Sequence, residues 1–245
     1  MVSVRFLGSG DAFGSGGRFQ ACIHVSGSGG SLLLDCGASS LVAMRKFGVD
    51  PATIDAILIS HLHGDHFGGI PFFVLDAQLV SKRERSLLIA GPPGIERRVV
   101  QAMEVLFPGS STVQRKFDVE FVELVERTSA RLGGAIVTAF AVKHASGATP
   151  YALRVEIGGR TVAYSGDTEW TDALSDAANS ANLFICEAYY FDKKMKHHMD
   201  YETLAFHAAE LGCGRIILTH MSAEMLSRLP DLDAEGASDG LEVTL

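Results

Sequence analysis

Four side chains that can bind a metal ion follow one apolar stretch of the chain. Residues 54–60 are mostly β-branched and apolar, and the sequence HLHGDH directly after them supplies His61, His63, Asp65 and His66. Imidazole nitrogens and carboxylate oxygens are together typical ligands of divalent transition metals. Three histidines and an aspartate in so short a segment therefore predict a metal site rather than a solvated polar loop.

The spacing within this segment predicts two neighbouring metal positions. His61 and His63 are two residues apart, so an extended backbone would direct both to the same side. Gly64 allows the chain to turn sharply, after which Asp65 and His66 can face a second point. One loop can therefore supply ligands to two adjacent ions.

Three further candidate ligands, His144, Asp167 and His220, each fall at or just after the carboxyl end of an apolar, strand-like run. Alone, each could equally be a loop histidine, a turn former or a helix cap. Side chains that follow strand ends gather at one edge of a sheet, where α/β proteins commonly bind ligands. Their shared placement therefore favours a common site.

The order of elements along the chain predicts two β-sheets between layers of helices, an α/β fold. Alternating and apolar patterns predict strands at 2–7, 19–25, 31–35, 54–60, 86–90, 117–124, 135–142, 151–157, 160–164, 183–186 and 215–219. Helical patterns cover 38–47, 67–81, 94–107 and 201–211, and Asp200 is the expected N-cap of the last helix.

The 245 residues suit one large globular domain or two small ones, and the lack of an internal linker favours one domain over 1–245. From about Asp231 the chain is acidic and contains Gly and Ser, so we expect a loosely held tail.

The composition limits which partners the protein can bind and in which cellular compartment we expect it. The net charge of -8 provides no global basic field, so a nucleic acid would have to be met locally. The four cysteines are scattered without CxxC pairing and indicate reduced, mostly buried thiols in the cytoplasm. The opening stretch has no basic segment before an apolar run, and no run approaches membrane-spanning length, so we expect neither export nor a membrane.

These motifs together resemble the metallo-β-lactamase superfamily over nearly the whole chain. The resemblance rests on HLHGDH, the later His144, SGDT around Asp167 and LTHMS around His220. Within that superfamily, the SGDT form, the tripeptide Cys186-Glu187-Ala188 and the stretch HHMDYETL are most similar to the ribonuclease Z and small-phosphodiesterase branch. The resemblance implies an αββα sandwich of two mixed β-sheets flanked by helices, a dinuclear site at the edge of the sheets, and a homodimer.

The resemblance also implies a role for each ligand. One metal would be held by His61, His63 and His144, the other by Asp65, His66 and His220, and Asp167 would bridge them. Two such ions, about 3.5–4 Å apart, lower the pKa of a bridging water from about 16 toward 7 and so make a nucleophile at neutral pH. We expect zinc, with manganese or iron as alternatives. Asp65 also counts as catalytic, because its loss should abolish turnover.

A phosphodiester needs in addition a proton for the departing alkoxide. His198 is the candidate donor because imidazole titrates near neutrality, and the adjacent His197 stays an alternative. Lys193, Lys194 and Lys196 precede them and could favour an anionic substrate, although a run of charge is usually a solvated face.

The expected activity is that of a metal-dependent hydrolase, a phosphodiesterase for small or cyclic phosphodiesters or RNA ends. Alternatives are a hydrolase of thioesters, lactones or lactams, a tRNA 3′-end endoribonuclease, and a non-catalytic metal-binding protein. Asp167 stands where zinc β-lactamases of the best-known subclass have cysteine, which disfavours lactams, and His198 favours phosphorus over a thioester.

Pre-tRNA processing is the weaker alternative for two further reasons. Bacterial ribonuclease Z proteins commonly carry a long arm that grips tRNA between the positions of His144 and Asp167, whereas here the interval suffices only for a β-hairpin. The opening loop GSGDAFGSGGR also lacks the proline and Arg-Asn usual in tRNA processors.

Overall fold

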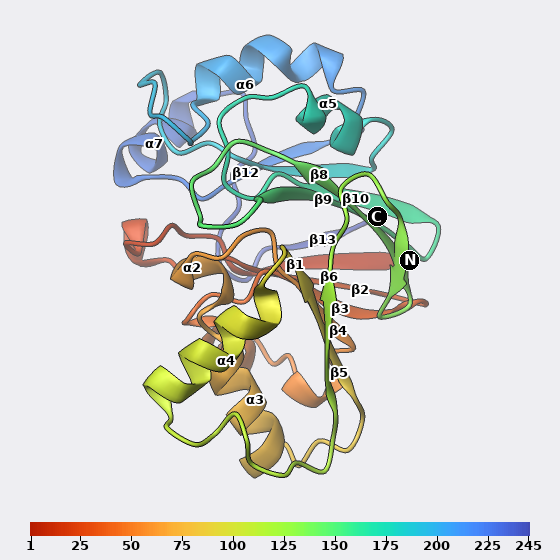
Figure 1. Ribbon diagram of the computed structural model, residues 1–245. Coiled ribbons are helices and arrows are strands. Elements are labelled where there is room, and N and C mark those ends of the chain that lie inside the picture. The colour runs from red at the N-terminus through yellow and green to blue at the C-terminus, as the bar shows by residue number, and fades with distance from the viewer.

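Two β-sheets pack face to face with helices on both outer sides in the computed structural model, which describes all 245 residues (Figure 1). The seven-stranded sheet has the order β13 (Glu242–Thr244), β1 (Val2–Gly8), β2 (Cys22–Gly27), β3 (Gly30–Leu34), β4 (Ala56–Leu58), β5 (Leu87–Gly91), β6 (Val119–Glu123). The six-stranded sheet has the order β12 (Ile216–Thr219), β11 (Leu183–Glu187), β10 (Arg160–Tyr164), β9 (Tyr151–Ile157), β8 (Ala135–Ala141), β7 (Ala130–Leu132). The predicted αββα sandwich is confirmed.

Helices cover each sheet on its outer face. The first sheet is covered by α1 (Ser40–Lys46), α2 (Gly64–Phe67), α3 (Ile70–Leu79) and α4 (Ile95–Leu106). The second is covered by α5 (Ala173–Ala178), α6 (Tyr201–His207) and α7 (Ala223–Arg228). Short 3-10 turns lie at Ser15–Gly17, Pro51–Thr53, Ala208–Glu210 and Leu229–Asp231.

The two-residue repeat of the strands divides the apolar residues between layers. In β3, Leu32 and Leu34 join the cluster of 26 buried residues between the sheets, whereas Leu33 joins the cluster under the first set of helices. Alternate side chains of a strand point to opposite faces, so a strand covered on both faces is apolar throughout. Strands of this kind can hold polar groups only where they end.

Those strand ends meet at one edge of the sandwich. β3 and β4 are parallel neighbours in the first sheet, and β10, β11 and β12 run parallel in the second. Their carboxyl ends lead into Asp35, His61, Asp167, Glu187 and His220. The chain therefore delivers polar groups from both sheets to a common rim.

The predicted helix 67–81 corresponds to α3, which is shorter at both ends, and the separate short helix α2 precedes it. α2 ends at Phe67 and α3 begins at Ile70. Between them, Gly69 donates its backbone N–H to the carbonyl oxygen of Cys36 at 2.8 Å, and a Cβ on Gly69 would lie 2.2 Å from the carbonyl oxygen of Gly37. Only glycine permits this approach, so the chain bends there instead of continuing as one helix.

The prediction of a loosely held tail from about Asp231 is also wrong. β13 pairs antiparallel with β1, and Ala237 and Val243 are buried. Alternation over residues 241–245 is short and lies within an acidic stretch, so its strand signal is weak, but it covers an otherwise open sheet edge. The patterns also did not predict the short elements β7, with three residues, and α5 and α7, with six residues each.

Two smaller expectations concern the chain as a whole. All four cysteines are free, and three of them are buried, as predicted. No helix combines the length and the apolar character that crossing a membrane requires.

Candidate metal centre

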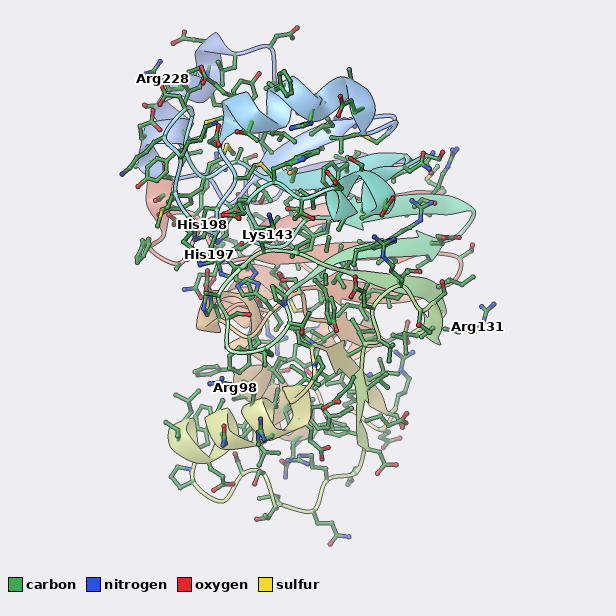
Figure 2. The ribbon with its side chains drawn as sticks, turned by 45° about the horizontal axis from the view of Figure 1, so that its top comes forward. Arg98, Arg131, Lys143, His197, His198 and Arg228 are labelled. Atoms are coloured by element: carbon green, nitrogen blue, oxygen red, sulfur yellow. The ribbon has the colours of Figure 1, made fainter.

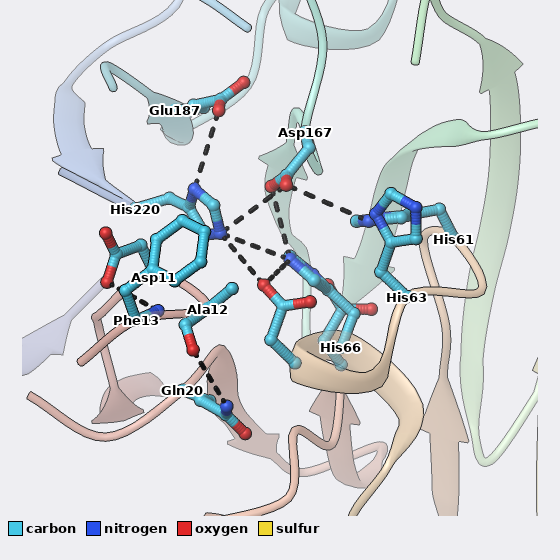
Figure 3. A network of polar contacts seen from close by, with 12 residues as sticks. Asp11, Ala12, Phe13, Gln20, His61, His63, His66, Asp167, Glu187 and His220 are labelled. Carbon is cyan, nitrogen blue, oxygen red and sulfur yellow. Dashed lines mark hydrogen bonds and ion pairs between the residues drawn. The ribbon is translucent and has the colours of Figure 1, made fainter. Parts of the chain in front are cut away.

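The structure brings all seven predicted ligands together at the shared edge of the two sheets. Figure 3 labels five of them: His61, His63, His66, Asp167 and His220. They form two groups, within each of which the ligand atoms lie within 4.8 Å of one another: His61, His63 and His144, and Asp65, His66, Asp167 and His220. The first sheet supplies the HLHGDH loop, and the second supplies the other three side chains. Residues far apart in the chain thus converge as the sequence predicted.

The three histidines of the first group direct ring nitrogens at one another. His63 Nδ1 and His144 Nε2 are 3.0 Å apart, and His61 Nε2 is buried with no hydrogen-bond partner. His144 Nδ1 donates to the carbonyl oxygen of His197 at 2.8 Å, so Nε2 is the nitrogen with a free lone pair. Ring nitrogens that converge in this way can hold a divalent cation between them.

The second group has the spacing of a tetrahedral site. His66 Nε2 and His220 Nε2 each lie 3.3 Å from Asp65 Oδ2, and the two nitrogens are 3.4 Å apart. Ligand atoms that bind zinc tetrahedrally at 2.0–2.1 Å are separated by about 3.3–3.4 Å. The side chains present therefore fit a divalent ion without rearrangement.

Asp167, a member of the second group, also faces the first. Its Oδ1 is 3.3 Å from His66 Nε2, while its Oδ2 is 3.8 Å from His61 Nε2 and 4.0 Å from His144 Nε2. Oδ1 is buried and makes no hydrogen bond. The two carboxylate oxygens of Asp167 therefore face nitrogens of both groups.

Charge in the cluster is already arranged for a cation. Burial raises the pKa of Asp65 and Asp167, but neighbouring histidines, His220 foremost, reverse this and hold both pKa values below the ordinary range. Burial lowers the pKa of His220, yet Asp167 and then Asp65 raise it to about 10. The carboxylates thus stay charged, and a bound ion would take the place of the protons that they hold on histidine.

Local backbone geometry aims these side chains. His63 has extended backbone, α2 begins at Gly64, and this change of direction separates His61 and His63 from Asp65 and His66. Gly64 keeps a negative φ, so the expected need for its conformational freedom is wrong. The carbonyl oxygen of His66 accepts from the N–H of Cys36 at 2.6 Å, which fixes the loop on the turn after β3.

The sequence analysis missed Asp35, which orients His66 of the second group through a hydrogen bond on the side of the ring away from the cluster. Asp35 is fully buried, and its Oδ2 accepts from His66 Nδ1 at 2.6 Å and from the Tyr164 hydroxyl at 2.9 Å. Ser60 donates to both carboxylate oxygens, from its backbone N–H at 2.7 Å and its hydroxyl at 2.8 Å. Because Nδ1 of His66 donates, Nε2 is left free for a metal. The available signal was its position at the end of an apolar strand.

The role of Glu187 was also missed. Glu187 is fully buried, and its carboxylate accepts from His198 Nδ1 and from the backbone N–H of Thr168 at 2.8 Å, while His220 Nδ1 lies 3.5 Å away. Burial lowers the pKa of His198, but the hydrogen bond to Glu187 and the negative charges of Glu187 and Asp167 together outweigh it, so the net pKa is raised. His198 is therefore held beside the cluster in a state that favours a proton.

His197 is placed differently from its neighbour. Its backbone N–H donates to the carboxylate of Glu169 at 3.2 Å, and its carbonyl oxygen accepts the hydrogen bond from His144 Nδ1. Its own Nδ1 is buried and has no hydrogen-bond partner. Its φ of 72°, like 58° at Asp35 and 55° at His220, lies in the left-handed region. Such strained positions gather at functional sites, and here they direct backbone groups at the ligands.

The three lysines before these histidines are only partly available. Lys193 lies 4.6 Å over the ring of Tyr190, and Lys194 pairs with Asp200 at 2.7 Å. Lys196 makes no ion pair, and it lines a surface hollow of about 350 Å³ together with His198 and Trp170. Asp200 also caps α6, as predicted, by accepting from the N–H of Thr203 at 2.9 Å.

The fold and the clustered ligands define a metal-dependent hydrolase of the metallo-β-lactamase superfamily. Within it, the chain belongs to the family described as Anti-Pycsar protein Apyc1, whose sequence profile matches residues 2–236. The chain is also related to ribonuclease Z, as the sequence analysis predicted.

Several relatives support this placement. The chain is 25% identical to ribonuclease Z of Agathobacter rectalis over 278 residues, which covers 92% of this chain and 89% of the relative. The crystal structure of the short form of human tRNase Z matches with a TM-score of 0.79 at 25% identity, covering 99% of this chain and 98% of that one. The metallo-β-lactamase fold protein YhfI of Bacillus subtilis has the same fold, with a TM-score of 0.78 at 21% identity over the full length of both chains.

Proposed function

We propose that residues 1–245 act as one hydrolase domain with two divalent metal ions, a phosphodiesterase for small or cyclic phosphodiesters. The two ligand groups on either side of Asp167 support two ions, and their mixed imidazole and carboxylate donors suit zinc first. When bound, such ions supply a nucleophilic water at neutral pH and neutralise charge on the phosphoryl oxygens.

In this proposal each ligand has the role that the resemblance implies. His61, His63 and His144 hold one ion, Asp65, His66 and His220 hold the other, and Asp167 bridges them. The buried nitrogen of His61 and the buried Oδ1 of Asp167, both without hydrogen bonds, support it, because each otherwise carries an uncompensated cost of burial.

The observation that carries the choice of phosphodiester is the pair formed by His198 and Glu187. The ring of His198 lies 5.0 Å from that of His144 and 6.2 Å from that of His220, measured between centroids, so it reaches both halves of the cluster. Glu187 favours the protonated ring, which can then give its proton to a departing alkoxide. A thiolate would need no such donor, so this pair favours phosphodiesters over thioesters.

The surroundings of His198 support a small, anionic substrate. The hollow beside it is only about 350 Å³, and Lys196 is free to attract a phosphoryl group there. The side chain of Lys143 is 62% exposed and pairs with Glu169, which also accepts from the backbone N–H of His197. Figure 2 shows Lys143 beside His197 and His198. Lys196, which has no ion pair, is the cation here that can attract an anion within a chain of net charge -8.

The interval that bears an arm in bacterial ribonuclease Z supports small substrates over pre-tRNA. Between His144 and Asp167 this chain has only a short loop followed by β9 and β10, which pair as an antiparallel hairpin within the second sheet. No segment there projects to grip a folded RNA. RNA ends remain within the proposal as small phosphodiesters of the same chemistry.

The test is a substrate panel on protein loaded with Zn²⁺ or Mn²⁺. We expect turnover of bis(p-nitrophenyl) phosphate and of a cyclic nucleotide, and little turnover of a thioester or a lactone. His198→Ala should reduce hydrolysis of the cyclic nucleotide, whose alkoxide leaves poorly, more than that of the activated ester. His197→Ala is the matched comparison and should cost less, because its backbone carbonyl remains.

Preference for the thioester or the lactone would contradict the proposal, and so would equal losses on both phosphate esters in His198→Ala. Lys196→Ala should raise KM for the cyclic nucleotide with little change in kcat. An unchanged KM would remove the cationic part of the proposal.

We also propose a homodimer in a reducing compartment such as the cytoplasm. α3, α4 and the residues after them expose several large apolar side chains, among them Leu79 at 59%, Val105 at 80% and Leu106 at 47%. Apolar surface of this kind commonly marks an interface, and the free cysteines fit a reducing environment. Light scattering that gives the mass of one chain for the wild type would contradict the dimer.

A further inference from the structure

One aromatic side chain on the loop beside the metal centre has no packing role. Phe13 is 83% exposed, within the glycine-rich loop that follows β1. Single exposed apolar residues are ordinary on helices such as α4 and α6, where Val105 and Phe206 are comparably exposed. Phe13 differs from these in its position and in how its backbone is held.

A buried carboxylate fixes the backbone around Phe13. Asp11 is fully buried, and its Oδ1 accepts from the N–H of Phe13 at 3.2 Å and from the N–H of Ser15 at 2.9 Å. Its Oδ2 accepts from the Ser15 hydroxyl at 2.7 Å. Gly14 directly after Phe13 has a φ of 69°, which other residues adopt only at a cost. The loop is therefore shaped in advance rather than free to collapse onto the surface.

The same loop is anchored on the metal centre. The carbonyl oxygen of Ser9, where the loop begins, accepts from the N–H of the ligand His220 at 3.2 Å. Four residues span at most about 13 Å, so Phe13 stays within that reach of the anchor. On its other side, Gln20 donates to the carbonyl oxygen of Ala12 at 3.4 Å. Figure 3 shows the ring of Phe13 on the same side of the cluster as Asp11 and His220.

We propose that Phe13 is a specificity-determining residue that stacks on the base of a nucleotide substrate while the metal centre holds its phosphodiester. This rests on the proposed function. A rigidly presented ring gives contact area at little entropic cost, and every base has a π-face, so stacking selects nucleotides without selecting one base. In this proposal the ring of Phe13 is exposed because no nucleotide is bound against it.

The kinetic test compares two substrates that differ only in the base. Wild type, Phe13→Ala and Phe13→Tyr, loaded with Zn²⁺, are assayed on adenosine 3′,5′-cyclic monophosphate and on the ribose cyclic phosphate without a base. Phe13→Ala should raise KM for the nucleotide roughly 5- to 150-fold, the range of base–aromatic stacking, with kcat changed little. KM for the abasic compound should not change, and Phe13→Tyr should restore the nucleotide KM.

A binding measurement separates this inference from the proposed activity. Stacking on Phe13 should quench the fluorescence of etheno-adenosine 5′-monophosphate, and Phe13→Ala should lose both the quenching and the affinity. Phe206→Ala, an exposed aromatic on α6, is the control and should bind as wild type. If the wild type binds and quenches the probe but hydrolyses no phosphodiester, the proposed function fails and the stacking role stands. If Phe13→Ala binds the probe as wild type does, if the wild type binds no probe, or if both substrates lose equally, the stacking role is refuted.

Discussion

Replacing Asp35 by asparagine should weaken one metal position selectively. Asp35 has a φ of 58°, and asparagine tolerates this left-handed conformation, so the backbone need not move. The amide has one acceptor oxygen and one donor nitrogen. If the nitrogen faced the Ser60 N–H, two donors would meet, so it must take the place of Oδ2, opposite His66 Nδ1.

That orientation reverses the tautomer of His66. Its Nδ1 becomes the acceptor, the proton moves to Nε2, and the lone pair that faces Asp65 and Asp167 is lost. Hydrogen bonds to buried charged groups are worth about 1.5–3 kcal/mol, and loss of the group that orients a ligating histidine typically costs roughly 10- to 100-fold in metal affinity. We expect a loss in this range at the position of His66, and much less at the position of His61.

The assay is a titration of metal-free protein with Co²⁺ or Zn²⁺ in chelator-buffered solution, resolved into two binding steps. Tyr164→Phe is the matched control, since it removes a hydrogen bond to the same oxygen of Asp35 but leaves His66 oriented. Its affinity should fall by no more than a few-fold. Two wild-type affinities in Asp35→Asn, or equal weakening of both positions in a folded variant, would refute the tautomer argument.

Three further predictions concern charge. Glu187→Gln should lower the pKa of His198, because the Glu187 carboxylate raises it. The alkaline limb of the pH profile of kcat should then move to lower pH. If this limb does not move, His198 is not the proton donor. Burial lowers the pKa of His24 to about 4. Between pH 6.5 and 4 the unfolded chain therefore binds more protons at this residue than the folded chain does. The free energy of unfolding should fall as the pH falls through this range, by about 3 kcal/mol for this group. His24→Gln should flatten that slope in denaturant titrations, and an unchanged slope would contradict this prediction. Asp167→Asn should lower metal content from two ions toward one by elemental analysis, and two retained ions would contradict a bridge.

The residues of the candidate metal centre could be predicted because their chemistry is concentrated in local sequence. The segment HLHGDH alone predicts a metal site. Asp167 and His220 each follow a short apolar run that a search for strand patterns detects. The hairpin strands β9 and β10 match the predicted ranges residue for residue, because alternation bounded by two glycines leaves little choice of register.

The supporting residues could not be predicted because their roles depend on distant partners. Asp35 and Glu187 are single carboxylates after apolar strands, a placement common in many folds. Only the packing of the two sheets shows that Asp35 meets Tyr164, 129 positions away, and that Glu187 meets His198. The bend at Gly69 is hidden for the same reason, since it depends on the approach of the turn after β3.

In the proposed site, each ion would bind side chains from both sheets and so link the two halves of the sandwich. Four ligands follow β4 in one sheet, and three come from loops of the other. Only the closed sandwich assembles both sets, so an ion bound there adds its binding free energy to folding, about 2.7 kcal/mol at a concentration one hundred times Kd. The melting temperature should therefore rise with the concentration of free Zn²⁺, and a thermal scan in a chelator series would measure occupancy without any substrate.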